Sequence, residues 1–358
     1  MCEGKTASGY PAGQAFKTVP VSEAVGMPLA HDITEIRPGE FKGRAFKKGH
    51  IIGAGDVCHL QRLGKEKVYV LSISDDEMHE DEAARALAGA LAGPGVVFGN
   101  EPKEGRLNLL AAHDGLLKIN VDALAQFNML GDVMCATLHA NTVVSKGDRI
   151  AGTRAIPLVV KRSIIDEAVA IARNGIVEVR AIRKPKAGVV ITGNEVFYGR
   201  IKDGFAPIIR QKIEQLGGEI RAIKYAPDDV EQIERSIRDC LEAGADLLVT
   251  TGGMSVDPDD VTRFAIRKLG AADLTYGSAV LPGAMMLVAY LGGMNGDAIP
   301  ILGVPACALF HQATVFDLVL PRILAGEKIG KMELARLGHG GLCLNCGECR
   351  YPVCPFGK

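Results

Sequence analysis

The sequence predicts an α/β protein in which helices cover both faces of a mostly parallel sheet, giving three α/β/α layers. Two observations indicate this fold. Short apolar strands alternate strictly with helical patterns from Gly188 to Val249, and two of the strands run directly into turns that contain glycine. Open sheets of this kind bind ligands at the carboxyl ends of their strands. The α/β domain is assigned to residues 181–330, after a mixed, β-rich region of one or two small modules (1–180) and before a cysteine-rich tail (331–358).

The first 180 residues are rich in glycine and in short apolar runs. Val68–Leu71 and Leu116–Ile119 predict strands, whereas Asp81–Leu91 carries alanine at five of its eleven positions and predicts a helix. The basic segment Arg180–Lys186 contains Pro185 and is the expected entry to the α/β domain.

The α/β domain opens with a strand at Gly188–Ile191, which Thr192–Glu195 ends. The loop at residues 196–205 is long enough to suggest a functional role. The elements expected next are a helix over Ala206–Leu216, a strand over Glu219–Lys224, and a helix that Asp228 or Asp229 caps and that ends at Glu242.

The most informative segment follows, at residues 246–262. A short apolar strand, Asp246–Val249, leads into Gly252-Gly253, where the backbone can approach a bound group without interference from a Cβ atom. Asp257 has the chemistry of an N-cap and Pro258 suits the first helical position, so a helix is predicted to begin at Pro258.

The start of that helix also predicts a ligand. Its free backbone N–H groups favour an anion, but Asp259 and Asp260 in the first turn would repel a bare phosphate. A cation between them removes the conflict, so the segment predicts Mg²⁺ with a phosphorylated ligand. The alternative is that these acids only cap a helix.

Five ordered motifs resemble the molybdopterin-binding domain shared by bacterial molybdopterin molybdotransferases, gephyrin and related adenylyltransferases. They span about Lys186 to Lys328 and comprise Ile191–Glu195, Gly199–Asp203, Thr250–Thr262, Leu281–Gly283, and Leu302–Pro305 before a helix over Cys307–Leu324. The resemblance implies a site for molybdopterin or the finished molybdenum cofactor, where Mg²⁺ assists adenylylation of the pterin phosphate or insertion of molybdate.

The resemblance also implies roles for single residues. Glu195, Asp203 and Asp260 match the acidic functional positions, and are expected to be catalytic and to position Mg²⁺. Contacts to the cofactor are expected from the glycine loops and the proline turns: Thr192, Gly193, Thr251, Gly252, Gly253, Ser255, Pro282, Gly283 and Pro305.

The chain departs from the family around the Pro-Gly turn. Transferases of the family usually carry lysines there, and these positions are Leu281 and Ala284. Gly204-Phe205 follows Asp203 where Ser-Asn is usual, and Val304–Cys307 stands in place of Pro-Gly-Asn-Pro. Loss of the lysines removes favourable charge, so ligand binding can persist while transfer chemistry weakens.

Three functions fit these residues. The leading hypothesis is a molybdotransferase-like enzyme of molybdenum cofactor biosynthesis that inserts molybdate into molybdopterin with the help of Mg²⁺. The second is a noncatalytic carrier or sensor of the cofactor that retains the pocket. The third is a hydrolase of the competence-damage-inducible type on the same fold, because Asp259–Arg263 also resembles the motif of that family.

The tail contains four cysteines within twelve residues, Cys343, Cys346, Cys349 and Cys354. Their spacing, C-x₂-C-x₂-C-x₄-C-P, resembles a bacterial ferredoxin cluster run, which has three residues before the last cysteine. A Cys₄ zinc site is the competitor, and an unmetallated redox tail is the third alternative. The spacing therefore predicts one metal centre, either iron–sulfur or zinc, after a flexible link at Gly338–Gly341.

Composition excludes several classes of protein. The formal net charge is −1, there is no tryptophan, and aromatic residues make up 5% of the chain, which does not suggest a nucleic-acid interface. The first residues lack an apolar signal core, and no segment approaches the ~20 apolar residues that span a bilayer. We expect a cytoplasmic protein with a pterin ligand and neither nucleic acid nor membrane as partner. A homo-oligomer, or a partner among the molybdoenzymes or biosynthetic proteins, is left open.

Overall fold

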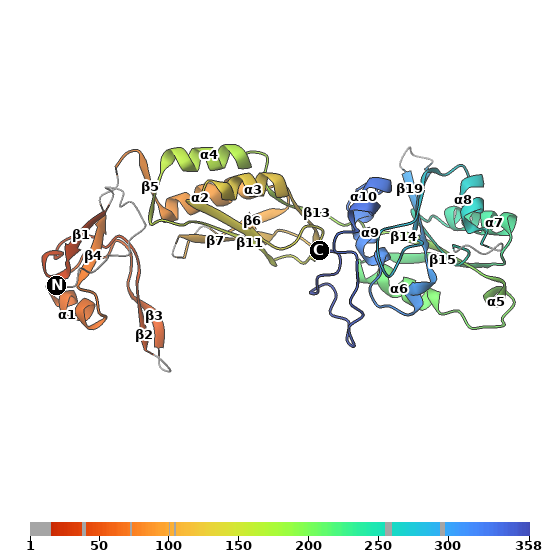
Figure 1. Ribbon diagram of the computed structural model, residues 1–358, viewed down its shortest axis with the longest axis horizontal. Coiled ribbons are helices and arrows are strands. Elements are labelled where there is room, and N and C mark those ends of the chain that lie inside the picture. Colours follow the sequence, from red (N-terminus) through yellow and green to blue (C-terminus); the bar gives the residue numbers. More distant parts are fainter. Residues whose placement is uncertain are drawn as a thin grey trace, which may run out of the picture. The chain divides into compact units, whose positions relative to one another are not determined.

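The computed structural model describes residues 16–37, 41–71, 74–99, 101–103, 105–254, 260–293 and 298–358. The chain divides into two compact units (Figure 1). Unit 1 comprises residues 1–112, 119–138 and 146–178, and unit 2 comprises residues 113–118, 139–145 and 179–358. No helix in the described ranges is long and apolar enough to cross a membrane.

Unit 1 is a mixed α/β unit with many short strands. The predicted helix is α2 (Glu80–Leu91), where the His79 side chain caps the first turn by accepting from Asp81 N. The other elements are β1 (Phe16–Pro20), a 3₁₀ turn η1 (Val21–Glu23), β2 (Ile33–Arg37), β3 (Phe41–Phe46), α1 (Ala54–Arg62), β4 (Lys67–Leu71), β5 (Glu77–His79), β6 (Val96–Phe98), β7 (Arg106–Ala111), α3 (Val121–Met129), β9 (Val133–Thr137), β11 (Arg149–Ala155), β12 (Val159–Lys161) and α4 (Arg162–Ala172).

The largest sheet of unit 1 runs β6-β7-β11-β9 across the described strands, and all its neighbours are antiparallel. Helix α2 packs against β7 and β11, and α4 packs against α2 (Figure 1). Leu87 and Leu91 of α2 and Leu109 of β7 are fully buried and form part of this core.

Unit 2 contains the predicted parallel sheet. Among the described residues, six strands pair in the order β15-β14-β16-β19-β18-β17. The four strands from β15 to β19 in this order are parallel, whereas β18 is antiparallel to both of its neighbours. The strands are β14 (Lys186–Thr192), β15 (Glu219–Ala226), β16 (Leu247–Thr251), β17 (Ala272–Tyr276), β18 (Leu287–Gly292) and β19 (Ala298–Val304), and a further sheet pairs β10 (Val143–Val144), β8 (Gly115–Ile119) and β13 (Val177–Arg180).

Helices cover both faces of the six-stranded sheet (Figure 1). One face packs against α6 (Phe205–Gln215) and α9 (Val315–Leu324), through residues such as Ile209 and Phe316. The other packs against α7 (Val230–Glu242) and α8 (Thr262–Lys268), through residues such as Ile237. The predicted three-layer α/β/α fold is therefore confirmed. Its short helical elements are α5 (Asn194–Phe197), the 3₁₀ turn η2 (Ala306–Leu309) and α10 (Lys331–Arg336).

Two predicted helices were wrong in extent. Helix α8 begins at Thr262, after the non-helical Asp260 and Val261, so it does not extend back to the predicted start; Asp257 and Pro258 themselves lie outside the described residues. The expected helix over Cys307–Leu324 is divided into η2 and α9. The Thr314 hydroxyl and the Asp317 carboxylate form a capping box that starts α9 afresh.

The flexible link expected at Gly338–Gly341 was also wrong. These glycines are packed against backbone, because a Cβ atom on Gly340 would overlap Lys358 O and one on Gly341 would overlap Leu337 O. Phe356 belongs to the same core cluster as Ile209 and Phe316 and is 3% exposed. The tail is therefore part of the packing of unit 2.

Candidate functional site

Two glycine turns open at the same edge of the sheet of unit 2. Strands β14 and β16 are adjacent and parallel, and Ile191 pairs with Thr251 near their carboxyl ends. The turn after Thr192 and the turn at Gly252 consequently lie side by side. This confirms that both glycine loops share the carboxyl edge, where α/β sheets bind ligands.

Three threonines fix these turns to each other. Thr192 Oγ1 donates to Thr251 O over 2.9 Å and lies 3.1 Å from Thr262 Oγ1. Thr262 Oγ1 in turn donates to Gly252 O over 3.1 Å. All three side chains are buried, so these bonds are shielded from water and join β14, β16 and α8 into one rigid group.

Gly252 and Gly253 are required by the packing of the protein itself. Their φ angles are +81° and +58°. A Cβ atom on Gly252 would overlap Thr192 O, and one on Gly253 would overlap Thr262 Oγ1. The space beside these two Cα atoms is therefore filled by the threonine group, and a side chain at Gly252 would disturb the turn whether or not a ligand is bound.

Two hydroxyls at the end of β16 are buried without a partner. Thr250 Oγ1 and Thr251 Oγ1 make no hydrogen bond to any described residue, and both side chains are 0% exposed. A buried hydroxyl without a partner costs about 1–3 kcal/mol.

The predicted acidic residues lie in different settings. Glu195, in α5, is exposed, and its Oε1 would be 2.6 Å from a Cβ atom on Gly193, whose φ is +137°. The Glu195 side chain thus folds back over the Gly193 turn. Asp260 is half-buried just before α8, and Ser255 lies outside the described residues.

Asp203 acts as a helix cap. Its carboxylate accepts from Phe205 N (2.7 Å) and Ala206 N (3.2 Å) at the start of α6, and from Tyr225 OH (3.2 Å). Burial and the neighbouring Asp203 charge raise the pKa of Tyr225, so its hydroxyl stays a donor. Asp203 therefore holds the 203–206 turn against β15.

The acids do not form a preassembled metal cluster. Across the described ranges, no group of three or more His, Cys, Asp or Glu side chains is placed to hold a metal ion. Magnesium is commonly held by one or two carboxylates together with water and substrate phosphate. The oxygens of Asp203 already accept three hydrogen bonds, so Asp203 is engaged in holding its own turn.

One residue at this edge was not recognised as a site residue from the sequence. Asp228 Oδ2 accepts from Asn194 N over 2.9 Å, and Asn194 Oδ1 accepts from Asp228 N over 3.4 Å. The helix cap is the neighbouring Asp229, which accepts from Gln232 N. The sequence contained a signal for this role. Two aspartates follow the strand in succession, and because a helix cap needs only one of them, the other is available for a different contact.

The Pro-Gly turn packs on the start of α9. Val315 N donates to Pro282 O over 3.2 Å, and Ser278 Oγ donates to Gly283 O over 2.9 Å. Pro305 is buried at the end of β19, where it precedes η2. Both proline turns thus lie at the carboxyl ends of strands or in the adjoining loops, as expected. In the Pro282-Gly283 turn, the exposed position 284 is an alanine and supplies no base.

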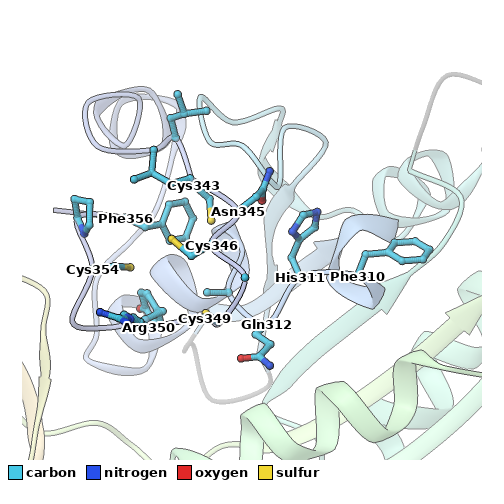
Figure 2. A pocket seen from close by; sticks show the side chains of 16 residues that line it. Phe310, His311, Gln312, Cys343, Asn345, Cys346, Cys349, Arg350, Cys354 and Phe356 are labelled. Atoms are coloured by element: carbon cyan, nitrogen blue, oxygen red, sulfur yellow. The ribbon is translucent and has the colours of Figure 1, made fainter.

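The cysteine tail is attached to this same turn. Leu281 N donates to Gly341 O and Cys343 N donates to Leu281 O, each over 2.8 Å. Beyond this contact lies a cavity of about 360 Å³ whose walls include all four tail cysteines and His311 (Figure 2). The cysteines are free thiols and do not form a preassembled metal cluster, so the predicted metal centre stays a prediction.

Sequence comparison identifies the family of this domain. Residues 188–325 match the family described as a probable molybdopterin binding domain, and residues 18–72 match a domain of unknown function. The α/β domain of unit 2 is therefore a member of the molybdopterin-binding domain family. The turns at Thr192 and Gly252 fall within the matched range.

Similar proteins include both classes weighed above. A CinA-like protein of Mycobacterium tuberculosis is 42% identical over 77 residues, which cover 22% of this chain and 18% of that protein. A molybdopterin molybdenumtransferase of Synechococcus elongatus is 30% identical over 139 residues, 37% of this chain and 34% of the relative. The chain thus matches only a minor part of the length of each.

Two solved structures are also similar to part of this chain. The tungsten cofactor synthesizing protein MoaB of Pyrococcus furiosus is 19% identical, with 40% of this chain and 97% of that chain covered and a TM-score of 0.35. The protein CinA of Thermoplasma acidophilum is 20% identical, with 35% and 90% covered and a TM-score of 0.31.

Proposed function

We propose that unit 2 binds molybdopterin at the carboxyl edge of β14 and β16, and acts as a molybdotransferase-like enzyme of molybdenum cofactor biosynthesis. The observation that carries this proposal is the joining of two family turns by the Thr192–Thr251–Thr262 group. The ligand contacts would come from these turns and from the proline turns at Pro282 and Pro305. The buried hydroxyls of Thr250 and Thr251 offer hydrogen bonds that no described residue uses.

Magnesium would supply charge neutralisation for the ligand phosphate and for the group being transferred. Glu195 and Asp260 are the carboxylates of this chain that would hold it. Asp203 would position the 203–206 turn rather than bind the ion, because it caps α6 and accepts from Tyr225. Asp228 would hold the Glu195 turn in place through its two hydrogen bonds to Asn194.

Each alternative function rests on its own observation. The exposed Ala284 and the absence of lysine from the Leu281–Ala284 turn favour a carrier or sensor that binds the cofactor without transfer. The 42% identity to a CinA-like protein favours a hydrolase of the competence-damage-inducible type. The metal centre predicted for the tail has no part in any of these three functions.

The test is a set of anaerobic assays with the purified full chain. Molybdopterin released from a molybdoenzyme should bind, and molybdate with Mg²⁺ should convert it into cofactor that activates a cofactor-free molybdoenzyme. Binding without any Mg²⁺-dependent activation would identify a carrier, and hydrolysis of a dinucleotide would identify the third function. Absence of molybdopterin binding would remove the site assignment itself.

A further inference from the structure

The last residues of the chain form a closed loop on unit 2. Gly357 N donates to Gly340 O over 2.9 Å, so the two ends of residues 340–357 meet. Phe356 is inserted in the core, and Tyr351 OH donates to Asp317 O over 3.3 Å. Burial raises the pKa of Tyr351, in keeping with an anchored side chain. The loop is therefore fixed at its ends and at two aromatic anchors, as a compact Ω-type loop is.

All four cysteines of the tail lie between the ends of this loop, and all four line one cavity (Figure 2). Cys346 and Cys349 are exposed, and Cys343 and Cys354 are half-buried. His311, from the loop before α9, lies on the wall of the same cavity. These four thiols share one cavity and one short loop, whereas scattered core cysteines are isolated from one another.

The other described cysteines are in different settings. Cys135 and Cys240 are buried one by one, and burial raises the pKa of Cys135 to about 12 and that of Cys240 to about 11. Cys307 is half-buried in η2, and Cys58 is exposed on α1 of unit 1. These thiols neither line the cavity nor belong to the loop, so they serve as internal comparisons.

We propose that Cys343, Cys346, Cys349 and Cys354 form a four-thiolate site for a metal centre inside this closed loop. Four thiolates that converge on one site repel one another unless a cation neutralises them. The closed ends reduce the chain entropy lost when four ligands converge. Gly347 lies between Cys346 and Cys349, both of which are exposed, and a Cβ atom on Gly347 would meet nothing within 4 Å.

Two centres share this ligand chemistry. Iron–sulfur clusters use compact runs of cysteine thiolates, and zinc is held by four thiolates or by three and a histidine, for which His311 is at hand. In either case the ion would order residues 341–343, which are bonded to Leu281 beside the Pro-Gly turn. The site itself does not depend on the pterin ligand.

The experiment compares three full-length proteins purified anaerobically from cells supplied with iron and zinc. These are the wild type, the double variant Cys346→Ser with Cys349→Ser, and the control Cys58→Ser. Iron, zinc and acid-labile sulfide are measured per chain. The wild type and the control should carry either iron with sulfide or about one zinc, and the double variant should lose it. Both replaced cysteines are exposed, so serine should leave the fold intact, as circular dichroism can verify.

Thiol alkylation followed by mass spectrometry gives a second readout. Metal should protect Cys346 and Cys349 from alkylation, and a chelator should expose them, whereas Cys58 should react in both states. Metal retained at full stoichiometry in the double variant would overturn the proposal. So would a wild type with neither iron nor zinc in which the tail thiols are alkylated with and without chelator alike.

Discussion

The two halves of the carboxyl edge of unit 2 are built differently. On the β14–β16 side, the Thr192 and Gly252 turns are locked together by buried hydroxyls. On the side of the Pro282 turn, Leu281 and Ala284 are exposed and carry no charge, and the tail is bonded to Leu281 through Gly341 and Cys343.

This difference separates two kinds of group, those that shape a ligand pocket and those that promote transfer. Groups that shape a ligand pocket must keep their backbone geometry, since each side chain there also packs against the protein. Charged groups that promote transfer can be lost without affecting the fold, because they are exposed. The β14–β16 side holds groups of the first kind, whereas the Pro282 turn has no base at Leu281 or Ala284 and is bonded to the cysteine tail.

The largest effect is expected from the tail. Phe356→Ala should lower the free energy of unfolding by about 3–5 kcal/mol, because it leaves a cavity in the core that Phe316 and Ile209 share. Chemical denaturation measures the loss. Val353→Ala, at a side chain that is 91% exposed, is the control and should change stability little. Equal stabilities of the two variants would show that the tail is only loosely attached.

Asp260→Asn tests the β14–β16 side. The change removes one negative charge with little change in shape, so Mg²⁺-dependent turnover should fall by about 10²-fold, while molybdopterin affinity changes much less. Asp229→Asn is the matched control, because asparagine also caps helix α7. If the two variants are equally active, Asp260 is only a residue near a helix end.

The sequence predicted the parts of this edge that depend on local patterns. Apolar runs that end in glycine turns predicted β14 and β16, and their parallel pairing followed from the helices between them. The break between η2 and α9 could have been predicted, because Thr314 and Asp317 have the spacing of a capping box.

Other features depend on contacts between distant parts of the chain. The glycines before the tail suggested a flexible link, but whether they pack depends on Gly357 and Lys358, which return to Gly340 through the closed loop. Likewise, the hydrogen bonds between Asp228 and Asn194 require the pairing of β15 with β14. No local pattern contains that information.

Thr251→Val and Thr192→Val should separate ligand binding from folding. Thr251 Oγ1 has no partner among the described residues, so valine should leave stability unchanged or slightly higher while molybdopterin affinity falls about tenfold, the value of one hydrogen bond. Thr192 Oγ1 donates to Thr251 O, so its replacement should lower stability by about 1 kcal/mol. Thermal unfolding and anaerobic binding are the two measurements. A loss of stability in Thr251→Val with unchanged affinity would mean that its hydroxyl serves the fold.

The smallest effect is expected where charge has been lost. Ala284 is exposed, and only its backbone oxygen is used, accepting from Ser278 N, so a lysine can be introduced there without disturbing the turn. Ala284→Lys should raise the affinity for the phosphorylated ligand by a few-fold at low salt, since one added charge near a phosphate contributes about 1 kcal/mol or less when exposed. The gain should disappear as salt is raised.

Ala284→Gln, of similar length without the charge, is the control, and binding titrations at two ionic strengths compare the pair. Equal affinities of the lysine and glutamine variants would place the phosphate away from the Pro282 turn. Higher Mg²⁺- and molybdate-dependent turnover in the lysine variant than in the wild type and the glutamine variant would show that a base at this turn promotes transfer.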